Sequence, residues 1–369
     1  MVNFAPPKNP VYTAFRFKVV RLKYNKEPNE FPEETTMIQV MKTRRRLLRA
    51  GVGVAALGVL FSLPTPAASD DAVKLGLILP MTGQQASTGK QISAAVKLYM
   101  DQNGDKVAGK KIEVILKDDG AIPDNTKRIA QELIVNDKVH AIAGFGITPT
   151  ALAIAPLATQ AKVPAIVMAA GTSIITERSP FFVRTSFTLP QSSSIVGQWA
   201  YKNGIKKVVA IITDYAPGID ALNFFKSNFT EAGGQILEEI KAPLANPDFA
   251  PFLQRARDVS PDAIFIFVPS GHGATFMKQY IERGLDKAGI KVIGPGDVTD
   301  DDQLNNMGDQ VLGTVTIHHY SAAHPSKTNK DFVAAFEKAN NFRPNFMAVG
   351  GYDGMHVLYE ALKKTGGKA

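Results

Sequence analysis

The sequence predicts an α/β fold made of two doubly wound parallel-sheet lobes joined by a hinge. Three observations indicate this fold. Short apolar segments alternate with longer amphipathic ones, which is the pattern of strands and helices. The short segments are apolar at successive positions, as parallel strands are when helices cover both faces of their sheet. The alternation occurs in two series, and 369 residues are enough for two domains.

The first series predicts one lobe. We expect right-handed connections between its strands, because strand–helix–strand units in one sheet nearly always take this hand. Strands are expected at 74–80, 112–117, 141–144 and 165–168, and helices at 91–103, 124–135 and 150–159.

The second series follows residues 184–198, which contain Thr, Ser, Pro and Gln but little apolar periodicity, and which we interpret as the crossing between the lobes. The predicted domains are lobe 1 at 70–188, lobe 2 at 189–320, and a return to lobe 1 with the hinge at 321–369. Strands are expected at 208–213, 263–268 and 291–294, and helices at 219–232 and 274–283.

Residues 41–69 have the features of an export signal. Arginines and a lysine precede an apolar stretch at 51–63, and small residues follow it. This stretch is shorter than the roughly 20 residues that span a bilayer. The segment 43–49 resembles a twin-arginine signal, and an ordinary secretory signal with extra arginines is the alternative. We therefore predict a periplasmic protein whose signal is cleaved between Ala67 and Asp70.

The segment before this signal does not fit an exported protein, because a signal peptide belongs at the start of a chain. We interpret residues 1–40 as a spurious extension, with Met37 or Met41 as the true start.

Composition excludes several classes of function. Residues 1–69 hold 11 of the 42 Lys and Arg and only four of the 34 Asp and Glu, so the remaining chain is nearly neutral and has no basic face for nucleic acid. The absence of cysteine excludes disulfides, thiolate catalysis and cysteine-bound zinc. Residues 70–369 contain neither a nucleotide-binding glycine motif nor a Gly-x-Ser-x-Gly motif, so we predict that the protein is not an enzyme.

Polar loops follow the expected strands. In open α/β sheets, ligands bind beyond the carboxyl ends of the strands. These loops offer hydroxyl groups and backbone N–H groups, and several of them open a helix, which suits an anion such as a carboxylate. The loops are 82–84, 146–150, 169–173, 214–218, 269–272 and 295–299.

The order of motifs in these loops resembles the branched-chain amino-acid-type binding proteins of ABC importers, the leucine/isoleucine/valine-binding family. The resemblance implies two lobes that close over a ligand, and delivery to a membrane permease served by separate ATPase subunits. We expect a monomer without a cofactor. Members of this family continue beyond their last helix, so we expect a truncated C-terminus. The motifs are Leu79-Pro-Met-Thr-Gly83, Ala-Gly-Phe-Gly-Ile-Thr at 143–148, Pro164-Ala-Ile-Val, Asp214-Tyr-Ala-Pro-Gly and Pro344-Asn-Phe-Met-Ala-Val-Gly-Gly-Tyr-Asp-Gly.

The resemblance also implies ligand-binding residues. On lobe 1, Thr148 matches the hydroxyl residue that binds the ligand carboxylate, and Thr150 lies in the same loop. Ala170 and Thr172 match the backbone and hydroxyl groups of the next loop. On lobe 2, Tyr215 matches an aromatic residue that stacks on the ligand. Phe346 is expected to form a lid.

The chain departs from the amino-acid binders at two places. They carry an acid directly after Gly-Pro to hold the α-ammonium group, whereas here Asp297 is one residue later and shorter, and Ser270 replaces a second-lobe tyrosine. The segment 317–324 looks similar to aromatic-acid binders, and His319 and Tyr320 in it are expected to line the cleft. An aromatic or other apolar carboxylate is therefore the favoured ligand.

Two other functions remain open at this stage. One is a branched-chain or other amino-acid binding protein of the same transporter class, and the other is a ligand-sensing receptor subunit. The three histidines of 317–324 have no partner residues at metal-ligand spacing, so we expect no metal site.

Overall fold

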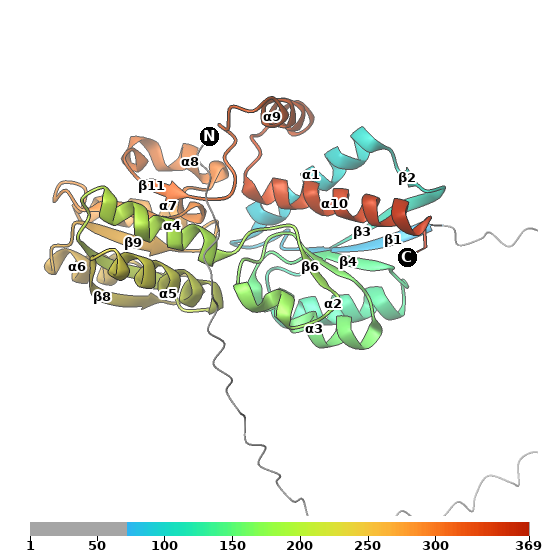
Figure 1. Ribbon diagram of the computed structural model, residues 1–369, viewed down its shortest axis with the longest axis horizontal. Coiled ribbons are helices and arrows are strands. Elements are labelled where there is room, and N and C mark those ends of the chain that lie inside the picture. Colours follow the sequence, from blue (N-terminus) through green and yellow to red (C-terminus); the bar gives the residue numbers. More distant parts are fainter. Residues whose placement is uncertain (1–71, 369) are drawn as a thin grey trace, which may run out of the picture. The chain divides into compact units, whose positions relative to one another are not determined.

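Two mainly parallel β-sheets, each enclosed by helices, make up residues 72–368, the part of the chain that the computed structural model describes (Figure 1). The predicted export signal and N-terminal extension lie outside these residues. Every strand pair is parallel except one short antiparallel pair at the edge of the first sheet. The predicted α/β fold of two doubly wound lobes is confirmed.

Lobe 1 contains the first sheet and also receives the end of the described chain. Its strands are β1 (Ala72–Leu79), β2 (Lys106–Val107), β3 (Lys110–Asp118), β4 (Ala141–Gly144), β5 (Ala165–Val167) and β6 (Phe182–Arg184), in the order β2-β3-β1-β4-β5-β6. Its helices are α1 (Ala86–Asn103), α2 (Pro123–Val135), α3 (Thr148–Ala161), η1 (Ser173–Glu177), α9 (Lys327–Asn340) and α10 (Phe346–Thr365).

Lobe 2 contains the second sheet. Its strands are β7 (Lys207–Thr213), β8 (Gln235–Ala242), β9 (Ala263–Phe267), β10 (Lys291–Pro295) and β11 (Val315–Ile317), in the order β11-β10-β9-β7-β8. Its helices are α4 (Leu189–Lys202), α5 (Ala216–Glu231), α6 (Ala250–Asp258), α7 (Gly273–Glu282), η2 (Gly296–Thr299), α8 (Asp301–Met307) and η3 (Gly308–Val311).

The central strands are buried on both faces, which explains their uninterrupted apolar sequences. In β7, Val208 and Ile212 pack with residues of α4 and α5, whereas Val209 and Ile211 pack with residues of α6 and α7. Lobe 1 repeats this arrangement, with α1 and α10 on one face and α2 and α3 on the other (Figure 1). Burying one such side chain contributes roughly 1.5–3 kcal/mol, so the central strands hold each lobe together.

Residues 189–198 correct the predicted crossing, because they form the first part of helix α4. Thr188 stands at the N-cap, and its backbone N–H donates to the side chain of Gln191, an interaction of the capping box. Leu189 and Val196 are buried. Polar residues at 191–194 interrupt the apolar pattern of this helix, so its apolar face is recognised only beside α5, and the crossing is limited to 185–188.

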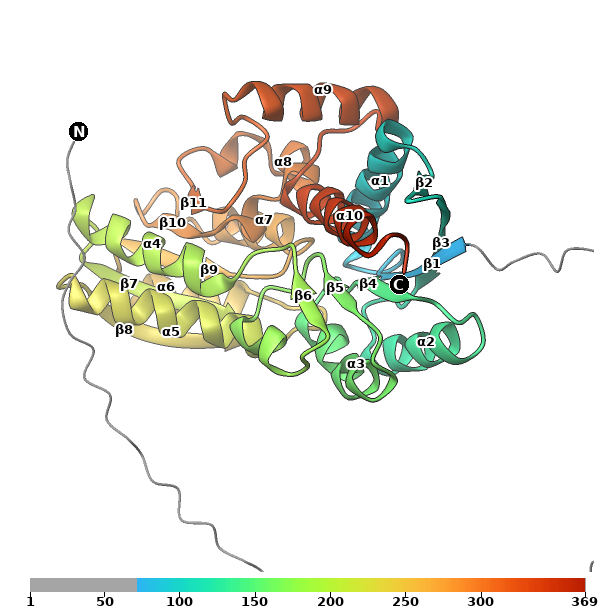
Figure 2. The ribbon, with the colours of Figure 1, turned by 45° about the vertical axis from the view of Figure 1, so that its right-hand side comes forward.

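Helices α9 and α10 return to lobe 1, where they lie beside α1 (Figure 2). Phe336 of α9 and Ala348 of α10 pack with Ala95 and Leu98 of α1. Among the described helices, none combines the length and the apolar character that a membrane span requires.

A close approach between α10 and lobe 1 yields a stability prediction. A Cβ atom at Gly350 would lie 2.0 Å from the carbonyl oxygen of Met168, which is backbone and cannot turn away. We expect Gly350→Ala to lower the free energy of unfolding by about 2 kcal/mol through overpacking. Val357→Ala, on the exposed side of the same helix, should change it by less than about 0.5 kcal/mol. Urea unfolding measures both, and equal stabilities would contradict the close packing.

Candidate functional site

A small cavity of about 20 Å³ lies between loops that follow strands of both sheets, and we call it the site cavity. Its volume is well below the 300–1,000 Å³ of typical small-molecule sites, so its two sides must move apart to admit an organic ligand. Lobe 1 lines it after β4 and β5, and lobe 2 lines it after β7, β9 and β10. The lining residues are Gln85, Gly146, Ile147, Thr148, Ala169, Ala170, Gly171, Phe187, Leu189, Tyr215, Pro217, Phe267, Pro269, Ser270, Asp297 and Met347.

The lobe 1 side presents neutral hydrogen-bond donors. Thr148 is the first residue of α3, and no side chain caps that helix end. The hydroxyl of Thr148 lies 2.7 Å from that of Thr172, and both residues are buried. Backbone N–H groups of a first helical turn have no partner inside the helix and favour an anion. This side can therefore bind a carboxylate.

A sharp bend after β4 brings Thr148 to the cavity. Phe145 has a φ of 65°, a left-handed conformation that a bulky residue rarely takes. The next residue, Gly146, passes so close to Pro80 that a Cβ atom would lie 2.6 Å from the proline ring. Such strained backbone is retained where the surrounding packing requires it, often at binding sites.

Arg184 hydrogen-bonds to the backbone of segments that form the lobe 1 side of the cavity. Its guanidinium donates to the carbonyl oxygens of Thr172 at 2.6 Å and Phe187 at 3.2 Å, which ties two cavity-lining segments together. Burial lowers the pKa of Arg184, and the negative charge of Asp220 acts in the opposite direction. Arginine remains charged at neutral pH, so the positive charge of Arg184 lies close to the hydroxyl donors of Thr148 and Thr172.

The lobe 2 side combines an aromatic ring with buried hydrogen-bond acceptors. The Tyr215 ring stacks on Phe267, with 6.1 Å between the ring centroids. Burial, and then the neighbouring Asp297 carboxylate, raise the pKa of Tyr215 well above its usual value, so its phenol stays neutral. Ser270 and Asp297 are buried, and Oγ of Ser270 and Oδ2 of Asp297 have no hydrogen-bond partner among the described residues.

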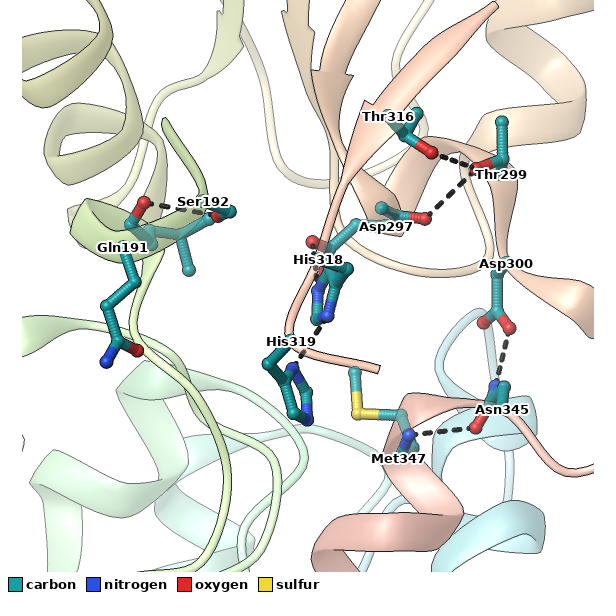
Figure 3. Close-up of polar contacts among 12 residues, drawn as sticks. Gln191, Ser192, Asp297, Thr299, Asp300, Thr316, His318, His319, Asn345 and Met347 are labelled. Atoms are coloured by element: carbon teal, nitrogen blue, oxygen red, sulfur yellow. Dashed lines mark hydrogen bonds and ion pairs between the residues drawn. The ribbon is translucent and has the colours of Figure 1, made fainter. Parts of the chain in front are cut away.

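An aromatic cluster borders the site cavity. His318 lies 4.4 Å from Phe187 and 4.0 Å from Phe346 between ring centroids, and His319 stacks on Phe187 at 5.1 Å. The Nδ1 atoms of the two histidines are 2.7 Å apart, so one ring donates to the other (Figure 3). Desolvation by the surrounding protein, and then His318, lower the pKa of His319 to about 3, so its ring is neutral at neutral pH although the residue reaches the surface.

A second, larger cavity of about 1080 Å³ lies next to this cluster, and we call it the outer cavity. The segment after β11, the N-terminal part of α9 and one side of α10 border it. Much of this lining is exposed, including His324, Ser326 and Thr328. We regard the smaller site cavity as the candidate ligand site, because buried polar groups from both sheets converge there at the strand ends.

The structure divides the ten predicted site residues between several places. Thr148, Ala170, Tyr215, Ser270 and Asp297 line the site cavity, and His319, Tyr320 and Phe346 line the outer cavity.

Two of the ten predicted residues, Thr150 and Thr172, line neither cavity. A third, Ala170, lines the site cavity but uses its backbone N–H in a hydrogen bond within the protein. Thr172 reaches the site cavity only through its contact with Thr148. The Thr150 hydroxyl donates to the carbonyl of Ile147, and Thr150 lines neither cavity. The backbone N–H of Ala170 donates to the carbonyl of Phe145, which occupies the group expected to bind a ligand.

Sequence reasoning missed several lining residues. Phe187 lies in the supposed crossing, Met347 directly follows the predicted lid residue, and Gln85 follows a loop that was recognised. His318 was noted only as a metal-ligand alternative. Within residues 72–368, no group of three or more His, Asp or Glu side chains is arranged to hold a metal.

Hydrogen bonds connect the lobes around the site cavity. The Asp220 carboxylate of α5 accepts from the backbone N–H and the hydroxyl of Ser173, both at 2.8 Å. Gln84 of lobe 1 contacts Asn246 at 2.8 Å and His272 at 3.1 Å in lobe 2. A further contact between the lobes lies at the start of α10, where the side-chain amide of Asn345 donates to the carboxylate of Asp300 (Figure 3).

Comparisons with known proteins identify the family and agree with the observed fold. Residues 72–369 match a family model described as periplasmic binding protein. A curated relative, Leu/Ile/Val-binding protein homolog 6 of Brucella melitensis biotype 1, is 43% identical over 321 residues, which are 86% of this chain and 82% of the relative. The resemblance predicted from the loop motifs is confirmed.

Two solved structures are similar over most of their length. One is a solute binding protein of an ABC transporter from Rhodopseudomonas palustris BisB5 in complex with 3,4-dihydroxybenzoic acid. It is 74% identical, with a TM-score of 0.80, and the match covers 81% of this chain and 83% of that one. The other is an ABC transporter solute binding protein from R. palustris in complex with 4-hydroxybenzoate. It is 40% identical, with a TM-score of 0.78 and coverage of 81% and 82%.

Removing the contact between Ser173 and Asp220 should shift the lobes toward a more open arrangement. Asp220→Ala removes two charge-assisted hydrogen bonds that join the lobes, and we expect the more open arrangement to gain roughly 5–30-fold in population. Small-angle scattering should show a larger radius of gyration. Asp214→Ala is the control, because Asp214 pairs with Lys241 inside lobe 2. An unchanged radius in Asp220→Ala would show that this contact does not hold the lobes together.

Proposed function

Since the chain belongs to the periplasmic binding protein family of ABC-type substrate-binding proteins, we propose that its ligand is an aromatic carboxylate held in the site cavity. The observation that carries this proposal is the pairing of neutral donors on one side of the cavity with stacked aromatic rings on the other.

The aromatic part of the proposal is supported by the rings around the cavity. Phe187, Tyr215 and Phe267 line it, and Tyr215 remains neutral. Flat aromatic surfaces favour a planar ligand, since offset-stacked and edge-to-face contacts add to the hydrophobic gain from burial. The two similar solved structures contain hydroxybenzoic acids, which agrees with this chemistry.

The carboxylate of the ligand is proposed to bind on the lobe 1 side. Thr148 and Thr172 supply hydroxyl groups there, and the first turn of α3 supplies backbone donors. Arg184 adds a positive charge behind them. The lobe 2 side carries the Asp297 carboxylate and would repel a second negative charge. The ligand therefore has one favoured orientation.

A branched-chain or other amino acid is the second candidate. Two observations favour it: the curated relative at 43% identity is named a Leu/Ile/Val-binding protein homolog, and Asp297 could pair with an α-ammonium group. A receptor subunit that senses such a ligand would have the same cavity.

Family membership is the basis for the proposed partners and location. Family membership implies an extracytoplasmic location. We propose that the protein is a periplasmic monomer, exported by the signal at 41–69, that delivers its ligand to a membrane permease with separate ATPase subunits. Lobe closure around the ligand would present the bound form to that permease, because a ligand stabilises the state that it binds more tightly.

Titration calorimetry tests the ligand class. We expect the protein to bind 4-hydroxybenzoate and to bind leucine much more weakly. Thr148→Val should weaken hydroxybenzoate binding roughly 10–100-fold, because it removes a hydrogen bond to a charged group. Thr159→Val is the matched control, since its hydroxyl donates to Ala155 and Ser179 at the far end of the same helix. Tighter binding of leucine than of any aromatic acid would refute the aromatic assignment.

A further inference from the structure

We propose that Asp297, assisted by His318, recognises a hydroxyl group on the aromatic ring, so that the protein selects hydroxylated aromatic acids over unsubstituted ones. This inference rests on the proposed function, because it assigns the end of the ligand opposite the carboxylate. It concerns the selection among different aromatic acids. Neither the fold nor the proposed binding of the carboxylate on the lobe 1 side determines this selection.

The starting observation is a buried acceptor that has no hydrogen-bond donor. Asp297 lines the site cavity, and only 6% of its side chain is exposed. Its Oδ2 lies 3.6 Å from Nε2 of His318, whose side chain is equally buried. Neither atom makes a hydrogen bond within the described part of the chain. A buried polar atom without a partner costs free energy, so this pair is suited to a polar group that enters with a ligand.

A ring hydroxyl is the group that suits both atoms. It is a donor and an acceptor at once, so it can donate to Oδ2 of Asp297 and accept from Nε2–H of His318. An ether or a halogen cannot donate to the carboxylate, and a second carboxylate would be repelled by it. Ser270, whose buried Oγ also lacks a partner, stands on the same side of the cavity.

The neighbouring histidine orients His318 for this role. His319 is neutral, and its Nδ1 lies 2.7 Å from Nδ1 of His318 (Figure 3). When His319 donates in this contact, Nδ1 of His318 is the acceptor, so the N–H of the His318 ring is at Nε2, which faces Asp297. The rings of Phe187 and Phe346 hold His318 in this position.

The position of Asp297 also sets the direction of the ligand. Asp297 lines the cavity from lobe 2, and Thr148 lines it from lobe 1. A hydroxybenzoate can place its carboxylate at Thr148 and its hydroxyl at Asp297, which satisfies both sides. Benzoate fills the same space but leaves Asp297 buried without a partner. Sites built to hydrogen-bond a hydroxyl discriminate strongly against ligands that lack it.

A ligand series on the unmodified protein is the first test. Calorimetry with benzoate, 4-hydroxybenzoate, 3,4-dihydroxybenzoate and 4-methoxybenzoate should give at least tenfold tighter binding for the two hydroxylated acids. The methoxy compound should bind no better than benzoate, because its oxygen cannot donate. Equal dissociation constants across the series would overturn the role of Asp297 and leave the proposed function standing. Failure of all four to bind would overturn both.

The variant Asp297→Asn is the second test, because it keeps the shape and removes the charge. We expect 4-hydroxybenzoate to bind at least tenfold more weakly, whereas benzoate binds as well as before or better, since an unpaired buried carboxylate is gone. A purely structural role of Asp297 would weaken both ligands in parallel, and that result would overturn the inference. Asp309→Asn, an exposed acid of the same lobe, is the control and should change neither constant.

The variant His318→Phe keeps an aromatic ring between Phe187 and Phe346 but removes the nitrogen atoms. It should weaken 4-hydroxybenzoate binding severalfold with little effect on benzoate. If Asp297→Asn does not fold, this variant and the ligand series decide the question, and unchanged selectivity in both would overturn the proposal.

Discussion

Burial of parallel strands between two layers of helices is the constraint on which the site depends. Inside such a sheet the backbone groups pair with neighbouring strands, and the side chains of β4, β7 and β9 are almost completely apolar and buried. The first groups free to bind a ligand are therefore those just beyond the strand ends. Parallel strands end at one edge, so loops from distant parts of the sequence meet at a single cavity.

The two sides of this cavity differ in charge character. Lobe 1 contributes hydroxyl and backbone donors with Arg184 behind them, and lobe 2 contributes the buried Asp297 carboxylate and the neutral phenol of Tyr215. An anion is favoured on one side and repelled on the other. Because the lobes are also joined by Ser173 and Asp220, a ligand that satisfies both sides would add to contacts that already hold them together.

The sequence predicts the buried elements accurately and the edge elements poorly. Strand 141–144 was predicted with the bounds that β4 has, because its four residues are all apolar or glycine and all buried. Strand β8 was missed, since it lies at the edge of its sheet and charged residues such as Glu239 interrupt its apolar pattern. The sequence predicts a linker at the start of helix α4, because the polar residues 191–194 interrupt its apolar pattern, and the face that packs on α5 becomes evident only in the folded structure.

The sequence by itself determined the two lobes, the inner strands of each sheet and the loops that could bind a ligand, because local apolar patterns encode all of these. It also indicated Thr148, Tyr215 and Asp297, which directly follow buried strands. Only the tertiary structure decided which loop side chains face the cavity. The placement of His318 beside Asp297 and Phe187 depends on contacts between elements far apart in the chain, and no local pattern encodes such contacts.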